Sequence, residues 1–379
     1  MEPNLSRSCV MIIAGETSGD LHGARLVNAM QDRKDSLFFC GVGGPALKAA
    51  GVRVLVDISE LAVVGFTEVF AKLPAILRHL AAVKKLLKVL KPDLLILIDF
   101  PEFNLNVAAA AKKIGIPVLY YISPQIWAWR PRRVRRIGKR VDHMAVILPF
   151  EERFYQDHHV RVTYVGHPLL DSGLPDVNEI LNAKTGSTPV IGLLPGSREN
   201  EIIRHIPVMM ETAAILKKGH QGIKFLLSHA PAVPRLQFDE ILAHCHADVD
   251  FEVVSGDVEH LFKQCHLVIA ASGTVTLQAA IYGMPMVIIY KVSTLSYWLG
   301  RALVRVNNIG LVNLIAGKEI VPEFIQHEAC ASNIAAKVSE MLNNVTGLRD
   351  MQRQLVKIRD VLGGSGASRR VAGIALEML

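Results

Sequence analysis

An aspartate at the end of a very apolar segment is the first candidate for chemistry. Asp99 closes the run "LLILIDF", and Pro101, Glu102 and Asn104 follow it. The run predicts a buried strand, and a carboxylate at its end is held rigidly where partial desolvation suits it to accept a proton. Asp99 is therefore predicted to be a general base; the alternative is a structural aspartate bonded to a loop amide.

A glycine-rich turn near the N-terminus, "AGETSGDLHG", carries a second acid. Its glycines allow close approach of a ligand, and the helix predicted to follow offers free N–H groups to an anion. The spacing matches neither a dinucleotide fingerprint nor a P-loop, so an ordinary strand-to-helix turn remains an alternative. Glu16, at the tip of the preceding strand, is predicted to meet a substrate hydroxyl.

Two further turns in the second half of the chain suit a diphosphate. In "LLPGSRENEI", Gly196 opens the loop, Ser197 is predicted to cap the next helix, and Arg198 is placed to meet a phosphate. The alternative is a capped helix with a solvated arginine. In "AASGTVTLQ", Ser272, Gly273 and Thr274 supply backbone and hydroxyl donors where a helix is predicted to begin. Gln278 lies one turn further along the same helix.

Basic residues gather in two places. Residues 69–92 contain no acid, and their lysines alternate with leucines at helical spacing, which predicts a helix with one apolar and one positive face. Such a helix covers a sheet or lies on an anionic membrane surface. The second place, "SPQIWAWRPRRVRRIGKR", is predicted to be a substrate-side loop with Trp127, Trp129 and Arg130, followed by a surface helix.

Composition narrows the class of protein. The 379 residues carry a net charge of +7 and are 50% hydrophobic, which predicts a folded protein whose surface favours anions. Five scattered cysteines without a CxxC pair favour a reduced, cytosolic location, and the N-terminus does not resemble a signal peptide. The "HCH" at residues 244–246 lacks the spacing of a metal site, so no metal and no cofactor are expected.

These residues need rigid elements to position them, and the chain supplies alternating strands and helices. Apolar runs separated by helical patterns predict parallel sheets covered on both faces. The pattern restarts after turn-rich residues 166–189, so we expect a first domain at 1–170 and a second at 171–345. The helices of 346–379 are predicted to cross back to the first domain or to reach a partner chain in a homodimer.

Nine segments together resemble one family in order and over nearly the whole chain. They are "AGETSGD", "ELAVVGFTEV", "IDFPEFN", "SPQIWAWRPRRV", "LPFE", "VGHPLLD", "LLPGSRENEI", "ASGTVTLQA" and "NLIAGKEIVPEFIQ". The chain thus resembles the lipid-A-disaccharide synthases. The resemblance implies an α/β GT-B fold, with two doubly wound Rossmann-like domains facing a central cleft, the first on the acceptor and membrane side and the second binding UDP-sugar.

The resemblance also implies a reaction. It is the inverting, metal-independent transfer of 2,3-diacylglucosamine from UDP to 2,3-diacylglucosamine 1-phosphate, by a hexosyltransferase of lipid A and lipopolysaccharide biosynthesis. The enzyme would lie at the cytoplasmic face of the inner membrane of a Gram-negative cell, without nucleic acid as a partner. Asp99 and Glu16 would be catalytic. Asn313 would join the UDP-sugar residues, and Ser18, Gly19 and Gln125 would join Trp127, Trp129 and Arg130 at the acceptor or its lipid.

The sequence departs from the family pattern at two positions, which carry Gln278 in place of glutamate and Glu102 in place of aspartate. Two other functions are weighed against this one. A UDP-sugar epimerase, or another UDP-sugar glycosyltransferase, would use the same double fold without need of the basic amphipathic helix. An RNA-binding protein would use the arginine-rich segment but would leave the three turns unexplained.

Overall fold

The chain divides into two compact units, each described here by itself. The first is Met1–Ser172 with Leu362–Leu379, and the second is Gly173–Val361. The computed structural model describes residues 7–58, 66–171, 173–182, 188–245, 249–256, 258–293, 297 and 308–379. Of residues 66–73, 129, 181 and 182 it describes the backbone alone. Among the described residues, no helix is both long enough and apolar enough to cross a membrane.

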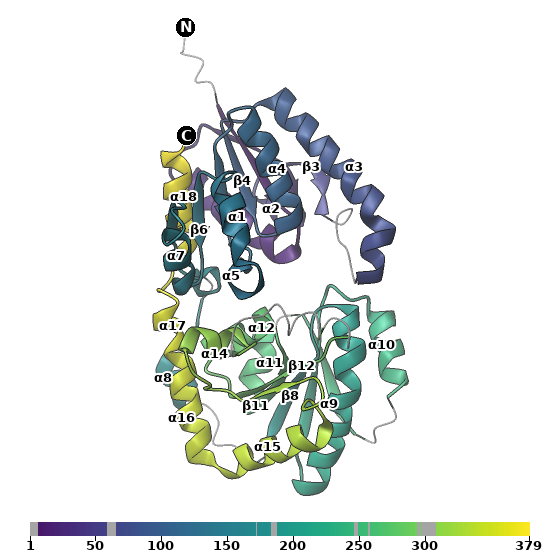
Figure 1. Cartoon of the computed structure of the whole chain (residues 1–379). Coiled ribbons are helices and arrows are strands. Elements are labelled where there is room, and N and C mark those ends of the chain that lie inside the picture. The colour runs from purple at the N-terminus through teal and green to yellow at the C-terminus, as the bar shows by residue number, and fades with distance from the viewer. Residues whose placement is uncertain are drawn as a thin grey trace. The chain divides into compact units, whose positions relative to one another are not determined.

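The first unit is built on a seven-stranded parallel sheet in the order β3-β2-β1-β4-β5-β6-β7 (Figure 1). Its central strands are apolar runs buried on both faces, as expected for a parallel sheet between helices. The strands are β1 (Ser8–Ala14), β2 (Leu37–Gly43), β3 (Arg53–Asp57), β4 (Leu94–Ile98), β5 (Val118–Tyr121), β6 (His143–Val146) and β7 (Val162–Tyr164).

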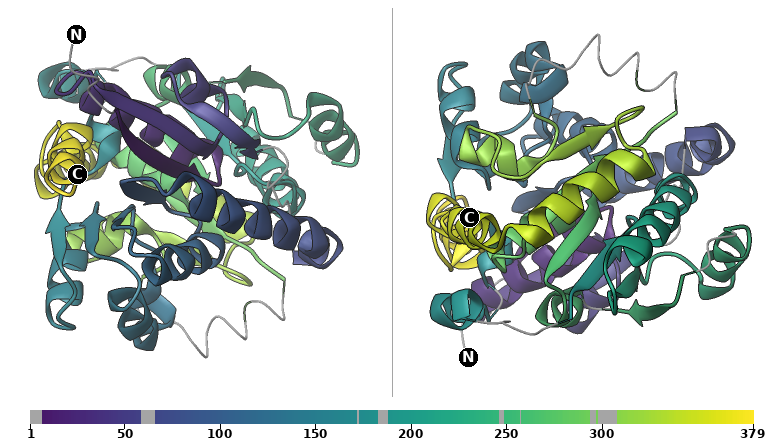
Figure 2. Two further views of the ribbon diagram at one scale, coloured as in Figure 1. Left: turned by 90° about the horizontal axis from the view of Figure 1, so that it is seen from above. Right: turned by 90° about the horizontal axis from the view of Figure 1, so that it is seen from below.

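Helices cover both faces of this sheet. One face packs against α3 (Phe66–Leu90), α4 (Pro101–Lys113) and α6 (Val134–Gly138). The other packs against α1 (Thr17–Gln31), α2 (Pro45–Ala49) and α18 (Ala367–Glu377). Two further helices, α5 (Ile126–Trp129) and α7 (Pro149–Gln156), follow β5 and β6. Although α18 ends the chain, it lies against α1 of the first unit, as its yellow ribbon shows in Figures 1 and 2.

The second unit repeats this plan with a six-stranded parallel sheet in the order β10-β9-β8-β11-β12-β13. The strands are β8 (Val190–Leu194), β9 (Lys224–His229), β10 (Phe251–Ser255), β11 (Leu267–Ala271), β12 (Met286–Tyr290) and β13 (Glu323–Ile325). The prediction of two doubly wound α/β halves is confirmed.

The helices of the second unit also lie on both sides of its sheet. On one face α9 (Glu199–Gly219) and α15 (Ala331–Asn343) pack side by side over the core, as the right panel of Figure 2 shows. The other helices that the structure describes are α8 (Val177–Asn182), α10 (Arg235–Ala243), α11 (Val258–Gln264), α12 (Thr274–Ile281), α14 (Leu311–Ala316), α16 (Val345–Val356) and α17 (Ile358–Val361).

Candidate functional site

The strand order places the first two candidate acids beside each other. In the first sheet the order reverses between β1 and β4, which are directly paired from Val10↔Leu94 to Ala14↔Ile98. Ligands of open parallel sheets bind beyond the carboxyl ends of the strands at such a reversal. Glu16 follows β1 and Asp99 follows β4, so both acids lie at the reversal.

The turn after β1 is held in place by packing and by a buried acid. A Cβ built at Gly15 would lie 2.3 Å from the Phe100 ring, so only glycine lets this turn approach the turn after β4. The carboxylate of buried Asp20 accepts hydrogen bonds from the backbone N–H groups of Gly44 (2.6 Å) and Ala46 (2.8 Å). Glu16 itself is an exposed residue immediately before α1.

Two more predicted residues of this turn differ in exposure. Ser18 is exposed, whereas Gly19 is buried, and a Cβ built on Gly19 would meet Ala14 at 3.4 Å. Ser18 could therefore contact a substrate with its side chain, while Gly19 contributes close packing of α1 on the sheet.

Asp99 is fixed through its main chain. Its N–H donates to the Tyr121 carbonyl (3.1 Å), and its own carbonyl accepts from Asn104 Nδ2 (2.7 Å) and from Tyr120 Oη (2.6 Å). Both Asp99 and Phe100 adopt φ of 47°, a left-handed conformation that is costly for residues with a side chain. Residues with a strained backbone occur preferentially at functional sites, which supports the hypothesis that this half-buried aspartate is a site residue.

The turn after β5, residues 123–130, is attached to α7; we refer to it as the tryptophan turn. Ser123 Oγ and Tyr155 Oη lie 2.8 Å apart, and Trp127 Nε1 donates to Glu151 Oε1 at 3.1 Å. The Trp127 ring also packs edge-on against Phe150, with centroids 4.7 Å apart. Gln125 of this turn is exposed, and the Trp129 side chain lies outside the described part of the structure.

The basic segment that follows is helical, in two short pieces. Residues Pro131–Arg133 form a 3₁₀ turn and α6 follows, with Val134 and Ile137 buried. Arg130 lies 3.9 Å from exposed Glu102, and Arg133 forms a closer ion pair with the same carboxylate. Glu102 therefore anchors the start of the segment to α4, a contact that sequence reasoning missed.

The second unit has its own reversal of strand order, between β8 and β11. These strands pair from Leu267↔Ile191 to Ala270↔Leu194. The turn with Gly196, Ser197 and Arg198 follows β8, and the turn at residues 272–274 follows β11. The two predicted diphosphate turns are thus neighbours at one edge of one sheet.

Glu201 caps helix α9, and the prediction that Ser197 does so is wrong. The Glu201 carboxylate oxygen Oε2 accepts hydrogen bonds from the backbone N–H groups of Ser197 (3.1 Å) and Arg198 (3.3 Å). A longer side chain bonds across the first turn here, as in a capping box. Gly196, with φ of 118°, leaves room, because a Cβ there would lie 2.5 Å from Glu201 Oε2.

Arg198 keeps an exposed side chain at this turn. Its Nη1 lies 3.5 Å from Glu201 Oε1, and the side chain is 62% exposed. A long cation with this exposure can reach a phosphate beside the turn, whereas the backbone N–H groups of Ser197 and Arg198 are bonded to Glu201.

A buried histidine, missed by sequence reasoning, ties this turn to β12. His205 Nδ1 lies 2.8 Å from the Pro195 carbonyl, and its Nε2 accepts from the Lys291 N–H at 3.1 Å. These partners require the neutral ring with the proton on Nδ1, and burial lowers the pKa of His205 accordingly.

The turn after β11 presents backbone to solvent. Gly273 and Thr274 are exposed, and no described atom lies within 4 Å of a Cβ built on Gly273. Thr276 Oγ1 donates to the Gly273 carbonyl (2.7 Å), which fixes the first turn of α12. Ser272 and Gln278 are both half-buried at this end of the helix. The open side of Gly273 leaves space for a ligand to approach the backbone.

Asn313 has a different environment from the other predicted site residues. It is fully buried; its Nδ2 donates to the Val321 carbonyl (2.8 Å) and to Glu323 Oε1 (2.7 Å), and its Oδ1 accepts from two backbone N–H groups. Glu323 in turn accepts from the N–H groups of Ile309 and Gly310. Asn313 therefore orders the chain around Gly310, and direct contact with a substrate stays a prediction.

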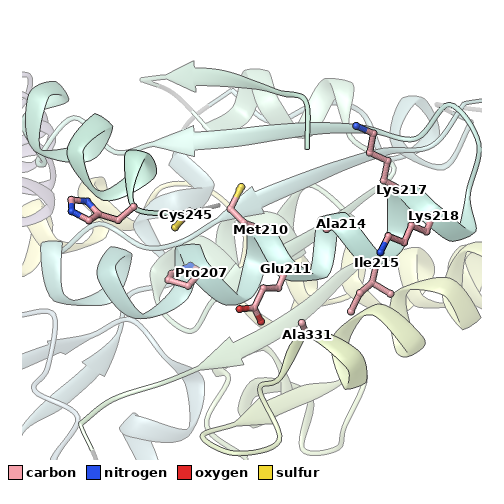
Figure 3. Close-up of a pocket in the computed structure, with 10 residues that line it drawn as sticks. Pro207, Met210, Glu211, Ala214, Ile215, Lys217, Lys218, Cys245 and Ala331 are labelled. Carbon is pink, nitrogen blue, oxygen red and sulfur yellow. The ribbon is translucent and has the colours of Figure 1, made fainter. Parts of the chain in front are cut away.

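A cavity of about 830 Å³ lies along the second half of α9 (Figure 3). Met210, Ala214 and Ile215 contribute apolar surface, and Glu211, Lys217 and Lys218 contribute charge. None of its lining residues belongs to the strand-end turns, so this cavity is separate from the candidate site of the second unit.

Comparison with known proteins decides the family. A family model described as lipid-A-disaccharide synthetase matches residues 10–374. The chain belongs to the lipid-A-disaccharide synthase family. A lipid-A-disaccharide synthase from Geobacter metallireducens is 47% identical over 376 residues, which cover 98% of this chain and 97% of that protein.

Solved structures agree with the fold of this chain. A UDP-GlcNAc 2-epimerase from Neisseria meningitidis, solved with UDP-GlcNAc bound, superposes with a TM-score of 0.63 at 13% identity, covering 97% of this chain and all of that one. MurG from Acinetobacter baumannii superposes with a TM-score of 0.57 at 15% identity, covering 98% and 99%. At these identities the likeness concerns the GT-B-type fold alone.

The family also decides between the functions that the sequence left open. As a lipid-A-disaccharide synthase, the chain is a glycosyltransferase of lipid A biosynthesis. Epimerases share the double fold, but the match over residues 10–374 is to the synthases. The hypotheses of an epimerase and of an RNA-binding protein are therefore set aside.

Proposed function

We propose that this glycosyltransferase uses Asp99 as the general base for attack by its acceptor. The substrates are UDP-2,3-diacylglucosamine and 2,3-diacylglucosamine 1-phosphate. As Asp99 takes the proton of the acceptor 6-hydroxyl, that oxygen bonds to the anomeric carbon of the donor. The bond from this carbon to the UDP oxygen breaks, UDP leaves with the electron pair, and the product is the β-1,6-linked disaccharide 1-phosphate.

The observation that carries this proposal is the position of Asp99 at the strand-order reversal of the first sheet. Although Asp99 lies in the turn after β4, three hydrogen bonds hold its main chain and so give its carboxylate a fixed support. Glu16, at the same reversal, orients a sugar through its hydroxyls. The tryptophan turn follows the neighbouring strand β5, so Gln125, Trp127 and Arg130 are assigned to the acceptor or its acyl chains. Ser18, which is exposed beside Glu16, is assigned to the acceptor as well.

The second unit is proposed to hold the donor. Arg198 neutralises charge that grows on the diphosphate as UDP leaves, and the amides at residues 272–274 add hydrogen-bond donors. Gln278 meets the ribose with a neutral amide. These groups come from two adjacent strand ends, which supports one continuous site for diphosphate and ribose.

We further propose that the enzyme works at an anionic membrane surface. Val83 and Leu87 of α3 are buried against the core, so the apolar face of this helix mainly covers the sheet. Its outer face still combines exposed Lys85 and Lys88 with large exposed side chains, Leu77, Val89 and Leu90. That combination suits anionic headgroups above an acyl boundary.

The direct test is to mix purified protein with both substrates in detergent and to detect UDP and the tetraacyl disaccharide by mass spectrometry. We expect both products in equal amounts. Release of UDP without disaccharide, or no product at all, would overturn the proposed reaction.

A further inference from the structure

Glu151 is a fully buried carboxylate that the proposed mechanism does not use. It lies in the first turn of α7, directly after the β6 segment, and is 1% exposed. One carboxylate oxygen accepts from Trp127 Nε1 (3.1 Å), and the other accepts from the Leu148 N–H (3.1 Å). Within the described part of the chain, no lysine, arginine or histidine pairs with it.

A buried carboxylate is costly to keep ionised unless it is paired and hydrogen-bonded. Burial raises the pKa of Glu151 to about 7, although the bonds from Leu148 and Trp127 oppose this shift. A buried acid with such a raised pKa is a candidate for a functional role, and its hydrogen bonds indicate which role.

The residues that Glu151 contacts belong to the tryptophan turn. Trp127 is held by its indole N–H and by edge-on packing against Phe150. Ser123, at the start of the turn, pairs with Tyr155 one helical turn beyond Glu151. The turn leaves β5 at Tyr121, whose carbonyl accepts from the Asp99 N–H. Helix α7 thus fixes the tryptophan turn, and strand β5, which precedes that turn, also fixes the proposed base Asp99.

We propose that Glu151 is a positioning residue for the transfer reaction, because its carboxyl group holds the tryptophan turn in the conformation that binds the acceptor. This inference rests on the proposed function only in assigning the turn to the acceptor. Glu151 touches no substrate and acts through Trp127.

The direction of the pH effect follows from the raised pKa. The folded protein holds a proton on Glu151 that the unfolded chain releases, so the stability it contributes is complete below about pH 4.5 and is lost as pH rises through about 7. In the described part of the chain, the ionisable group that faces Glu151 is Tyr155; burial raises its pKa, so it stays neutral across this range. Neighbouring Glu152 bonds the Tyr164 N–H instead (2.9 Å).

A fluorescence titration tests the contact without any substrate. In a background with Trp129→Phe and Trp298→Phe, Trp127 is the remaining tryptophan. We expect its emission maximum to shift between pH 5 and pH 9 with a midpoint near neutral pH, and Glu151→Gln to abolish the shift while Glu152→Gln retains it. An emission maximum that does not change between pH 5 and pH 9, or that shifts with the same midpoint in Glu151→Gln, would overturn the inference.

Kinetics test the consequence for catalysis. Glu151→Ala should raise KM for the acceptor substrate about tenfold and leave KM for the UDP-sugar within about twofold. The reason is that the substitution removes the carboxylate oxygen to which Trp127 Nε1 donates its hydrogen bond. Glu151→Gln, which keeps one acceptor oxygen, should restore most of the acceptor affinity. Equal effects on both substrates, or the same effect from Glu152→Gln, would contradict positioning. If the wild type forms no disaccharide, the proposed function fails, while the titration still decides the role of Glu151.

Discussion

At the scale of single residues, acids of similar sequence context have different roles. Asp99 is held by its main chain at a strand end, whereas Glu102 is exposed and pairs with two arginines. Glu151 is buried and forms no ion pair with a described residue, and Glu201 caps a helix. Their surroundings, rather than their residue type, separate a proposed base from an anchor, a positioning group and a cap.

Arg198 gives a prediction at this scale. Arg198→Ala should lower kcat/KM for the UDP-sugar by about thirtyfold, since a charge-assisted hydrogen bond contributes about 2 kcal/mol. Initial rates at varied UDP-sugar concentration measure this change. Arg204→Ala, which removes another exposed arginine of α9, is the matched control and should stay within about twofold. Equal losses in both variants would remove Arg198 from the diphosphate site.

The residues that sequence reasoning missed have partners far along the chain. Glu151 meets Trp127 across 24 positions, and His205 meets Lys291 across 86. Most candidate residues that sequence reasoning identified lie just after the end of a strand, because that signal is local: an apolar run followed by glycine and a polar side chain. Asn313, inside α14, was named only through the family resemblance. A buried acid or histidine inside a helix gives no comparable pattern until the fold brings its partner near.

At the scale of elements, long and continuous patterns were predictable and short ones were not. The run "LLILI" is β4, buried on both faces, and the amphipathic pattern of residues 69–92 is mostly α3. Strand β2 and the edge strands β3 and β13 were not identified. The apolar run of β2 is interrupted by Gly41, whereas β3 and β13 have only partly buried or exposed residues and are short.

Helix α3 gives the second prediction. Lys84→Glu, Lys85→Glu and Lys88→Glu together should weaken binding to anionic vesicles by at least a hundredfold, since each lysine near such a surface contributes about 1 kcal/mol. Vesicle co-sedimentation at low salt measures this loss. Reversal of three exposed lysines of the second unit, Lys218, Lys224 and Lys263, is the control. Unchanged binding after the α3 reversals would leave this helix as a cover of the sheet only.

At the scale of the whole molecule, the last residues of the chain complete the first unit. Asp171 accepts from the N–H groups of Gly366, Ala367 and Ser368 and from the Ser368 hydroxyl, so it caps α18. Beside this cap, burial lowers the pKa of His22 to about 4 and that of His167 to about 3. The first unit thus contains two histidines that fold in the neutral form.

Acid should therefore destabilise this unit. The folded pKa values lie below the ordinary value of 6.5, so the stability of the neutral histidines is present above pH 6.5 and is lost as pH falls toward 3 to 4. Between pH 7 and pH 5 we expect each histidine to remove about 2 kcal/mol from the free energy of unfolding. As pH falls from 7 to 5, Glu151 raises the free energy of unfolding while the histidines lower it. The effect of one histidine is therefore measured by comparing the wild type with a variant that lacks it.

Urea unfolding of the wild type and of His167→Asn at pH 7 and pH 5 measures that difference. The asparagine keeps an acceptor for the Leu169 N–H but cannot take up a proton. The variant should lose about 2 kcal/mol less than the wild type over this interval. The same loss in both proteins would show that His167 is not held neutral.

The central claim is that Asp99 accepts the proton in the transfer step, and a single-turnover rate tests it most directly. Asp93 provides the matched control, because it lies before β4 at the opposite end from Asp99 and bonds the Cys9 N–H. With enzyme in excess over donor, Asp99→Asn should slow disaccharide formation by about 10² to 10⁴ while circular dichroism stays unchanged, and Asp93→Asn should stay within a few-fold of wild type. Near-normal transfer by Asp99→Asn would contradict the account.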